Sequence, residues 1–159
     1  MRWMLALMLC ALTGTMAAAD PAQTVYVMRH LNTPEGERDP DLTVEGKTSA
    51  DALVHWFHGK PLKAIYVSDY KRTRQTAAPL AAERGIAVTV YDPRDTPGLI
   101  ARVRAERGPV LIVGHSNTVP EIVEKLGGTR PADLTHPDFG DVWTISGGHS
   151  DRAKLPSAS

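Results

Sequence analysis

The feature that most constrains the fold is the regular alternation of short apolar segments with longer amphipathic ones after residue 20. The first apolar segment, TVYVMR at residues 24–29, has almost no polar interruption, which is typical of a parallel strand covered on both faces. Further strands are expected at 64–67, 86–91, 110–113 and 141–146, and helices at 43–59, 70–83, 98–108 and after residue 117. This alternation predicts an α/β fold, a three-layer sandwich whose mostly parallel central sheet is flanked by helices.

The N-terminal residues follow a different pattern. Arg2 precedes an apolar run from Trp3 to Leu12, and alanines at 17–19 form a cleavage site of the A-x-A kind, so residues 1–19 are predicted to be a signal peptide. The apolar run is too short for a comfortable membrane span, so no stable membrane insertion is expected after cleavage. The predicted location is the periplasm or the cell exterior. The folded domain is expected at residues 20–148, and the small polar residues 149–159 are expected to form a disordered tail.

Charge and cysteine content exclude several classes of function. Eighteen Lys and Arg residues balance 18 Asp and Glu residues, so the chain has no overall electrostatic footprint for nucleic acid. Any anion binding must therefore be local. The single cysteine, Cys10, lies in the predicted signal peptide, so the mature domain can form no disulfide and use no thiol nucleophile.

Polar side chains follow three of the predicted strands. Arg29 and His30 end the first strand, Ser68 and Arg72 follow the second, and His115 follows the fourth. In α/β folds of this kind, ligands bind outside the carboxyl ends of the strands. The sequence therefore predicts that these groups meet at one edge of the sheet and bind an anion.

Three motifs together resemble the histidine phosphatase superfamily, which is also called phosphoglycerate mutase-like. They are VMRH at 27–30, SDYKRTRQTA at 68–77 and VGHSNT at 113–118. The most specific part is the S-x-x-x-R-x-x-Q-T-A pattern that begins at Ser68. The resemblance covers about the whole mature domain and implies a compact, single-domain member of the superfamily.

The resemblance implies that His30 is the nucleophile that accepts a phosphoryl group, and that Arg29, Arg72 and His115 complete the phosphate pocket. The chemistry of these groups fits those roles. Guanidinium groups form paired, charge-assisted hydrogen bonds with phosphate oxygens. A neutral imidazole can attack phosphorus and form a covalent intermediate, and a second imidazole can donate to the phosphoryl oxygens. This chemistry needs no metal and no other cofactor.

Two further residues are candidate substrate contacts. Thr33 stands where the family often has a hydroxyl that touches phosphate, and Asn117 lies near the first amides of the helix after His115, which could help to hold an anion. One position departs from the family pattern, because Leu31 stands where many members have glycine after the nucleophile. A side chain there is expected to crowd the mouth of the pocket and to restrict the loop backbone.

The general acid is the second departure from the family pattern. One branch of the superfamily has an aspartate directly after the second histidine, where this chain has Ser116, and a hydroxyl is too weak an acid. The other branch has a carboxylate after the third strand, where Asp92 is the first candidate and Asp95 the next. Glu35 and Glu37, in the loop after the nucleophile, are further options.

These residues predict an exported, metal-independent phosphatase that hydrolyses phosphate monoesters through a phosphohistidine intermediate on His30. Its partner would be a small phosphorylated substrate and not a nucleic acid. Two alternatives stay open. A phosphohistidine-protein phosphatase would need less help from an acid, and a non-catalytic binder of phosphorylated ligands would need none. A serine hydrolase built on Ser116 fits less well, because it leaves Arg29 and Arg72 without a role.

Overall fold

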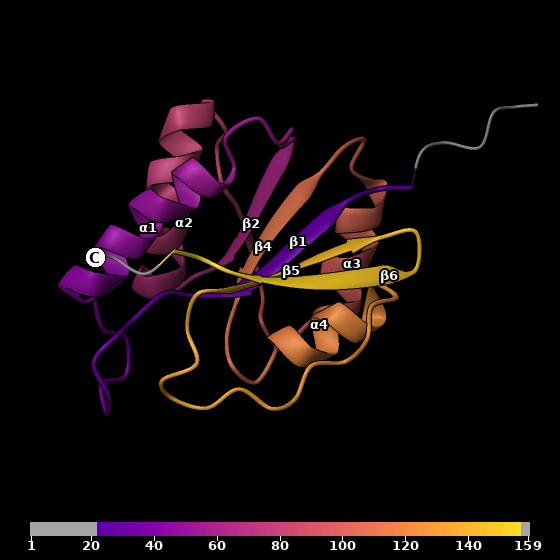
Figure 1. Cartoon of the computed structure of the whole chain (residues 1–159). Coiled ribbons are helices and arrows are strands. Elements are labelled where there is room, and N and C mark those ends of the chain that lie inside the picture. Colours follow the sequence, from indigo (N-terminus) through magenta and orange to yellow (C-terminus); the bar gives the residue numbers. More distant parts are fainter. Residues whose placement is uncertain (1–21, 157–159) are drawn as a thin grey trace, which may run out of the picture.

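In the computed structural model, which describes residues 22–156, six strands form one sheet with helices on both of its faces (Figure 1). The strands are β1 (Val25–Arg29), β2 (Ala64–Ser68), β3 (Thr89–Tyr91), β4 (Val110–Gly114), β5 (Asp141–Ser146) and β6 (His149–Lys154). The helices are α1 (Val44–Trp56), α2 (Lys71–Arg84), α3 (Thr96–Ala105) and α4 (Val119–Lys125). The predicted α/β three-layer sandwich is confirmed.

The strand order is β3-β2-β4-β1-β5-β6. The first four strands in the chain run parallel, since β4 pairs in parallel with both β1 and β2, and β2 pairs in parallel with β3. β1, β2 and β4 are buried along their whole length, which explains why their sequences lack an alternating pattern. β5 and β6 run antiparallel to their neighbours. The sheet is therefore parallel where the predicted anion-binding groups arise.

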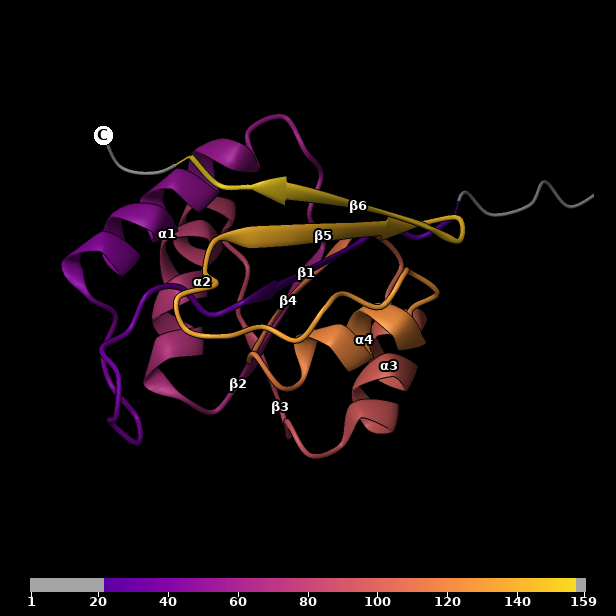
Figure 2. The ribbon, with the colours of Figure 1, turned by 60° about the horizontal axis from the view of Figure 1, so that its bottom comes forward.

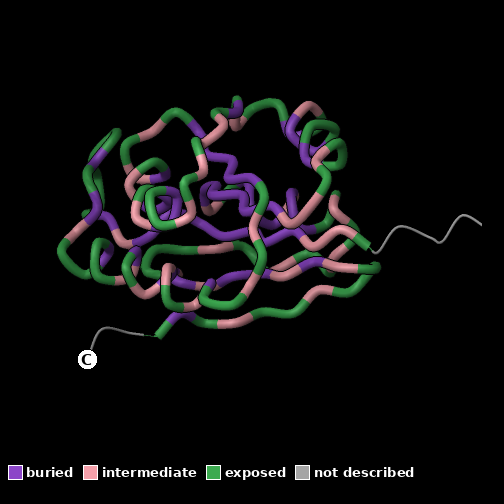
Figure 3. The backbone as a smooth tube through the Cα atoms, turned by 90° about the horizontal axis from the view of Figure 1, so that it is seen from above, coloured by how far each residue is buried: buried purple, intermediate pink, exposed green. Residues whose placement is uncertain are grey.

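The core lies on both faces of this sheet. α1 and α2 cover one face, where Phe57 and Leu80 are fully buried, and α3 and α4 cover the other, where Leu99 and Ile122 are buried (Figure 1). Buried residues concentrate along the central strands and on the inner sides of the helices (Figure 3). The two apolar layers hold the parallel strands in fixed register.

The predicted helix boundaries have identifiable caps. Thr43 is the N-cap of α1, and its hydroxyl accepts a hydrogen bond from the Gly46 amide at 3.0 Å. Asp95 caps α3 in the same way by accepting from the Gly98 amide at 2.9 Å. Gly85 ends α2 in a left-handed conformation, with a φ of 62°. The third strand begins later than predicted, because residues 86–88 precede the paired part of β3.

The prediction that residues 149–159 form a disordered tail is wrong for residues 149–154. These residues are β6, which pairs along its whole length with β5 at the edge of the sheet (Figure 2). Gly147 and Gly148 connect the two strands with φ angles of 56° and 79°. Two successive positive φ angles are what a tight hairpin turn requires, and a Gly-Gly pair is one of its sequence signals. The Gly-Gly pair is visible in the sequence, but the polar composition of residues 149–154 is not typical of a strand and favoured a disordered tail.

The predicted signal peptide, residues 1–19, lies outside the described residues and stays a prediction. Within residues 22–156, no helix is both long enough and apolar enough to cross a membrane.

Gly46 provides a test of how closely the loop after β1 is packed on α1. A β-carbon at this position would overlap the backbone oxygen of Asn32, which also accepts a hydrogen bond from the Thr43 amide at 2.9 Å. Alanine in a helix is normally favoured over glycine by about 1 kcal/mol. We expect the overlap to outweigh that gain, so that Gly46→Ala lowers the free energy of unfolding in urea by about 1–2 kcal/mol.

The control for Gly46→Ala is Thr48→Ala, at an exposed position of the same helix. This substitution should change the unfolding free energy by less than about 0.5 kcal/mol. A Gly46→Ala protein as stable as the parent would show that the loop after β1 moves freely away from α1.

Candidate active site

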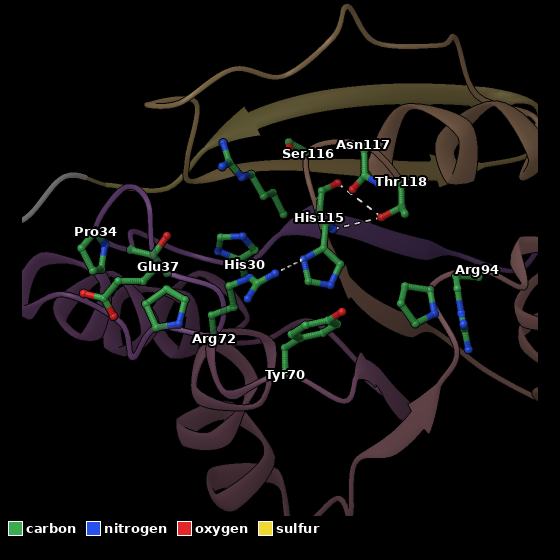
Figure 4. Close-up of a pocket in the computed structure, with 14 residues that line it drawn as sticks. His30, Pro34, Glu37, Tyr70, Arg72, Arg94, His115, Ser116, Asn117 and Thr118 are labelled. Carbon is green, nitrogen blue, oxygen red and sulfur yellow. Dashed lines mark hydrogen bonds between the residues drawn. The ribbon is translucent and has the colours of Figure 1, made fainter.

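A pocket of about 410 Å³ opens at the carboxyl ends of the parallel strands (Figure 4). β1 contributes its first wall, the β2–α2 connection its second and the β4–α4 connection its third. Residues from the loop after β1 and from the loop after β3 complete the rim. The lining consists of Arg29, His30, Thr33, Pro34, Glu37, Pro40, Tyr70, Arg72, Pro93, Arg94, His115, Ser116, Asn117 and Thr118. The predicted convergence of Arg29, His30, Arg72 and His115 is therefore present.

His30 is held in a defined orientation at the end of β1. Its backbone amide donates to the Gly114 oxygen at 2.9 Å, which continues the β1–β4 ladder by one bond. Its ring Nδ1 lies 2.8 Å from the Leu31 carbonyl oxygen. A carbonyl only accepts hydrogen bonds, so Nδ1 carries the proton and Nε2 keeps its lone pair. A bare Nε2 is what an imidazole nucleophile needs.

Leu31 does not crowd the pocket mouth, and that expectation is wrong. Its side chain is fully buried in the apolar layer beneath α1 and α2 and does not line the pocket. Its amide donates to the Thr76 hydroxyl at 2.9 Å. Among residues 22–156, only glycines have positive φ angles, so the loop backbone at Leu31 is unstrained. The side chain is accommodated because the loop turns it toward the core.

Arg29 is positioned by a loop that the sequence analysis did not identify. Its Nη1 donates to the backbone oxygens of Thr135 at 2.8 Å and Asp138 at 3.1 Å. Its guanidinium lies 4.1 Å from the centre of the Phe139 ring. Its Nε is buried and has no hydrogen-bond partner among the described residues. One edge of the guanidinium is thus fixed by protein, while other donors are left for a ligand.

Arg72 is held from two sides of the pocket. Its Nη1 donates to the Arg38 carbonyl at 3.3 Å and lies 3.4 Å from the Asp39 carboxylate. Its Nη2 lies 3.4 Å from His115 Nδ1 (Figure 4). The guanidinium also sits over the Tyr70 ring, 4.4 Å from the ring centre. Arg72 therefore contacts the second histidine directly and faces the pocket with a fixed orientation.

Helix α2 ties the motif S-x-x-x-R-x-x-Q-T-A to the loop that carries the nucleophile. The Thr76 hydroxyl accepts from the Leu31 amide and donates to the Arg72 carbonyl at 2.7 Å. The Gln75 side chain accepts from the Leu42 amide at 2.8 Å and donates to the Asp41 carboxylate at 2.6 Å. The motif thus joins three segments of chain that are distant in sequence.

Burial among cations keeps both pocket histidines neutral. The pKa of His30 is lowered to about 3, mainly by burial and further by Arg29, His115 and Arg72, while the hydrogen bond to Leu31 opposes the shift. The pKa of His115 is lowered to about 4, mainly by burial and then by the two arginines. The two rings lie 5.5 Å apart, centre to centre. At neutral pH the pocket therefore holds a neutral His30 ring among permanent positive charges.

The other predicted site residues divide into two groups. Thr33 and Asn117 line the pocket. Asp92 does not; it lines a neighbouring depression, and Arg94 binds its carboxylate at 3.1 and 3.0 Å, which lowers its pKa. Glu37 supplies the one carboxylate among the pocket-lining residues. Figure 4 shows Glu37 and Arg94 at opposite ends of the pocket.

The charge of the lining favours an anionic ligand. Arg29, Arg72 and Arg94 outnumber the single carboxylate of Glu37. Within the described part of the chain, no group of three or more His, Cys, Asp or Glu side chains is arranged to hold a metal ion. Paired guanidinium donors and two imidazoles match the oxygens of a phosphoryl group.

Comparison with known families agrees with this geometry. Residues 23–94, a little under half of the chain, match the model of the histidine phosphatase superfamily (branch 1). The matched segment carries Arg29, His30 and Arg72, and the fold places His115 beside them. Over these residues the chain is similar to the histidine phosphatase superfamily. None of the curated proteins matches it in sequence.

Several solved structures have a similar fold. A mycobacterial glucosyl-3-phosphoglycerate phosphatase is 15% identical with a TM-score of 0.66, covering 86% of this chain and 100% of its own. The protein histidine phosphatase SixA in complex with tungstate is 19% identical with a TM-score of 0.64, covering 85% and 97%. A candidate phosphohistidine phosphatase SixA from Nakamurella multipartitia is 26% identical with a TM-score of 0.57, covering 82% and 89%.

The lowered pKa of His30 predicts how stability depends on pH. Its pKa is near 6.5 in the unfolded chain and about 3 in the folded protein, so the unfolded chain binds more protons between these values. The stabilisation is complete above pH 6.5 and is lost as the pH falls toward 3. We expect the urea midpoint to fall between pH 6.5 and 4.5, and to fall less in His30→Gln.

The matched control is His55→Gln, since His55 is exposed on α1. This variant should show the same pH dependence as the parent. If the urea midpoint falls equally with pH in the parent and in His30→Gln, His30 is not buried as a neutral ring.

Proposed function

We propose that this protein is a metal-independent phosphatase that hydrolyses phosphate monoesters through a phosphohistidine intermediate on His30. One observation carries the proposal. The His30 ring is neutral, its Nδ1–H donates to the Leu31 carbonyl, and its bare Nε2 belongs to a pocket lined by Arg29 and Arg72. A buried lone pair next to fixed guanidinium groups suits attack on phosphorus and little else.

The reaction would proceed in two displacements. In the first, the Nε2 lone pair of His30 forms a bond to phosphorus, the ester P–O bond breaks, and the leaving oxygen takes a proton. In the second, water attacks the phosphohistidine and gives a proton back to the deprotonated acid, the P–N bond breaks, and inorganic phosphate leaves with His30 restored. Arg29 and Arg72 hold the phosphoryl oxygens through both steps. The positive charge that stabilises the negative phosphoryl group therefore comes from the protein.

The proton for the leaving oxygen comes, in this proposal, from Glu37. The sequence analysis favoured Asp92, but the Asp92 carboxylate is bound by Arg94, and its lowered pKa makes it a poor donor. Glu37 lines the pocket and follows His30 in the same loop. Position therefore favours Glu37 over Asp92.

The proposal includes export. The basic start, short apolar run and small-residue site in residues 1–19 support delivery to the periplasm or the cell exterior. Small phosphate esters present there would be the substrates.

A phosphohistidine-protein phosphatase is the second candidate, and one observation favours it. Glu37 is exposed, and no other carboxylate lines the pocket. A phosphorylated imidazole is a better leaving group than an alkoxide and needs less protonation. Structures of SixA proteins are among the neighbours. This candidate predicts activity on phosphohistidine without a contribution from Glu37.

The nucleophile is tested with an aryl phosphate and residues 20–159. An aryl leaving group needs little protonation, so this assay does not depend on the acid. We expect the parent to release phosphate, and His30→Ala to lose at least about a thousandfold in kcat/KM. His55→Ala, an exposed histidine on α1, is the control and should retain full activity. A folded parent that binds vanadate but releases no phosphate would instead support the non-catalytic binder.

The acid is tested with an alkyl phosphate in place of the aryl one. We expect Glu37→Gln to lose about 10²–10⁴-fold in kcat on the alkyl ester and much less on the aryl ester. Glu35→Gln, in the same loop, is the matched control and should behave as the parent. If only Asp92→Asn lowers kcat on the alkyl ester, Asp92 is the acid. No loss in either variant would favour phosphohistidine as the substrate.

A further inference from the structure

Behind His115, on the side away from the pocket, lie two buried hydroxyl groups. Ser68 ends β2, Thr73 lies in the first turn of α2, and both are fully buried. Ser68 Oγ is 2.7 Å from His115 Nε2 and 3.1 Å from Thr73 Oγ1. Thr73 Oγ1 is in turn 2.8 Å from the Ser68 carbonyl oxygen and 2.9 Å from the Tyr70 carbonyl oxygen. The three side chains form one continuous hydrogen-bonded chain.

The number of hydroxyl hydrogens determines which group donates and which accepts in each of these hydrogen bonds. The two carbonyl oxygens next to Thr73 can only accept, so the single hydroxyl hydrogen of Thr73 is donated to them. Thr73 then accepts from Ser68, which uses the single hydroxyl hydrogen of Ser68. Ser68 Oγ has no hydrogen left for the imidazole. It must therefore accept from His115, which places a proton on Nε2.

The surroundings of Nδ1, the other ring nitrogen of His115, independently indicate that the proton is on Nε2. His115 Nδ1 lies 3.4 Å from Nη2 of Arg72. A guanidinium has donors only and cannot accept a hydrogen bond. Nδ1 is therefore the acceptor in the neutral ring, and its lone pair is on the side of the pocket where Arg72 lies.

We propose that Ser68, supported by Thr73, is a positioning residue that fixes His115 in the Nε2–H form and turns Nδ1 toward the phosphoryl group. This inference rests on the proposed function, because it assigns His115 the task of holding phosphoryl oxygens. The two histidines thus carry their protons on opposite nitrogens. His30 keeps Nε2 bare because Leu31 takes its Nδ1–H, and His115 keeps Nδ1 bare because Ser68 takes its Nε2–H.

The arrangement also prepares His115 to become charged when substrate arrives. When a phosphoryl dianion takes the Arg72 Nη2 donor onto its own oxygens, the hydrogen bond from Arg72 to Nδ1 breaks and frees the Nδ1 lone pair. That nitrogen then takes up a proton from solvent and donates it in a hydrogen bond to a phosphoryl oxygen. The resulting imidazolium has two N–H groups and needs two acceptors. Ser68 Oγ supplies one acceptor and the phosphoryl oxygen supplies the other. Without Ser68, one N–H of a buried cation would have no partner, which is costly.

Other charged and titratable groups around His115 also affect this proton uptake. The surrounding arginines oppose the charged form, and Asp39 favours it. The groups that face the ring or act on it are Arg29 at the end of β1, His30 directly after it, Tyr70 and Arg72 at the start of α2, and Asp39 from the loop after β1. All of these groups are still present in a Ser68 variant. A difference in proton uptake between the parent and the variant is therefore due to the Ser68 hydroxyl.

The first experiment reads the tautomer directly, without using activity. Nitrogen-15 shifts of the imidazole distinguish a protonated from a bare nitrogen, and loss of the signal in His115→Gln assigns it. At pH 7.5 we expect the parent to carry its proton on Nε2. Thr73→Val frees the Ser68 hydrogen to donate to Nε2, so the population of the Nδ1–H form should rise. Thr73→Ser should restore the parent spectrum.

The second experiment measures the pH profile of kcat for aryl phosphate hydrolysis. Ser68→Ala removes one acceptor from the imidazolium of the enzyme–substrate complex. We therefore expect the alkaline limb of the profile to move to lower pH by about one to two units. The control, Thr96→Val, removes a buried hydroxyl at the start of α3, outside the pocket lining, and should leave the profile in place.

The outcomes separate this inference from the proposed function. A proton on Nδ1 of His115 in the folded parent would overturn the role of Ser68, whether or not the protein is a phosphatase. A parent without phosphatase activity would overturn the proposed function and leave the spectrum to decide the tautomer. An unshifted profile in a folded, active Ser68→Ala protein would show that the hydroxyl is only a packing contact.

Discussion

The parallel pairing of β4 between β1 and β2 is the constraint on which the rest of the site depends. Because β4 lies between these strands, His115 emerges between Arg29 and His30 on one side and Arg72 on the other. Backbone hydrogen bonds and two buried apolar layers fix the register of the three strands. The charged groups can therefore be held close together, although their mutual repulsion would separate them on a flexible scaffold.

Helix α2 converts this placement into a defined geometry. Its first turns carry Arg72 and Thr73, while Gln75 and Thr76 bind the loop between His30 and α1. A short motif therefore both places Arg72 in the pocket and holds the loop after His30 in place. This double use explains why the motif is specific: each polar side chain has a partner in a different segment of the chain.

Arg29, His30 and His115 are each oriented by a backbone oxygen or a hydroxyl. Leu31 takes the Nδ1–H of His30, the Thr135 and Asp138 carbonyls take the Nη1 donors of Arg29, and Ser68 takes the Nε2–H of His115. Neutral acceptors orient these groups without cancelling their charge. The Arg29 guanidinium thus keeps its positive charge, and burial lowers the pKa of both imidazoles.

The sequence by itself determined the layered fold and the four groups that converge on the pocket, because apolar strands, helix caps and a local motif are short-range signals. It did not determine which carboxylate lies in the pocket, since the bond from Arg94 to Asp92 and the path of the loop that carries Glu37 depend on the folded chain. It did not reveal that residues 135–139 hold Arg29, a contact across more than a hundred residues. Nor did it show where the Leu31 side chain goes or which nitrogen of each imidazole is bare. Those features were decided by the tertiary structure, because they depend on hydrogen bonds and packing between segments that are distant in the chain.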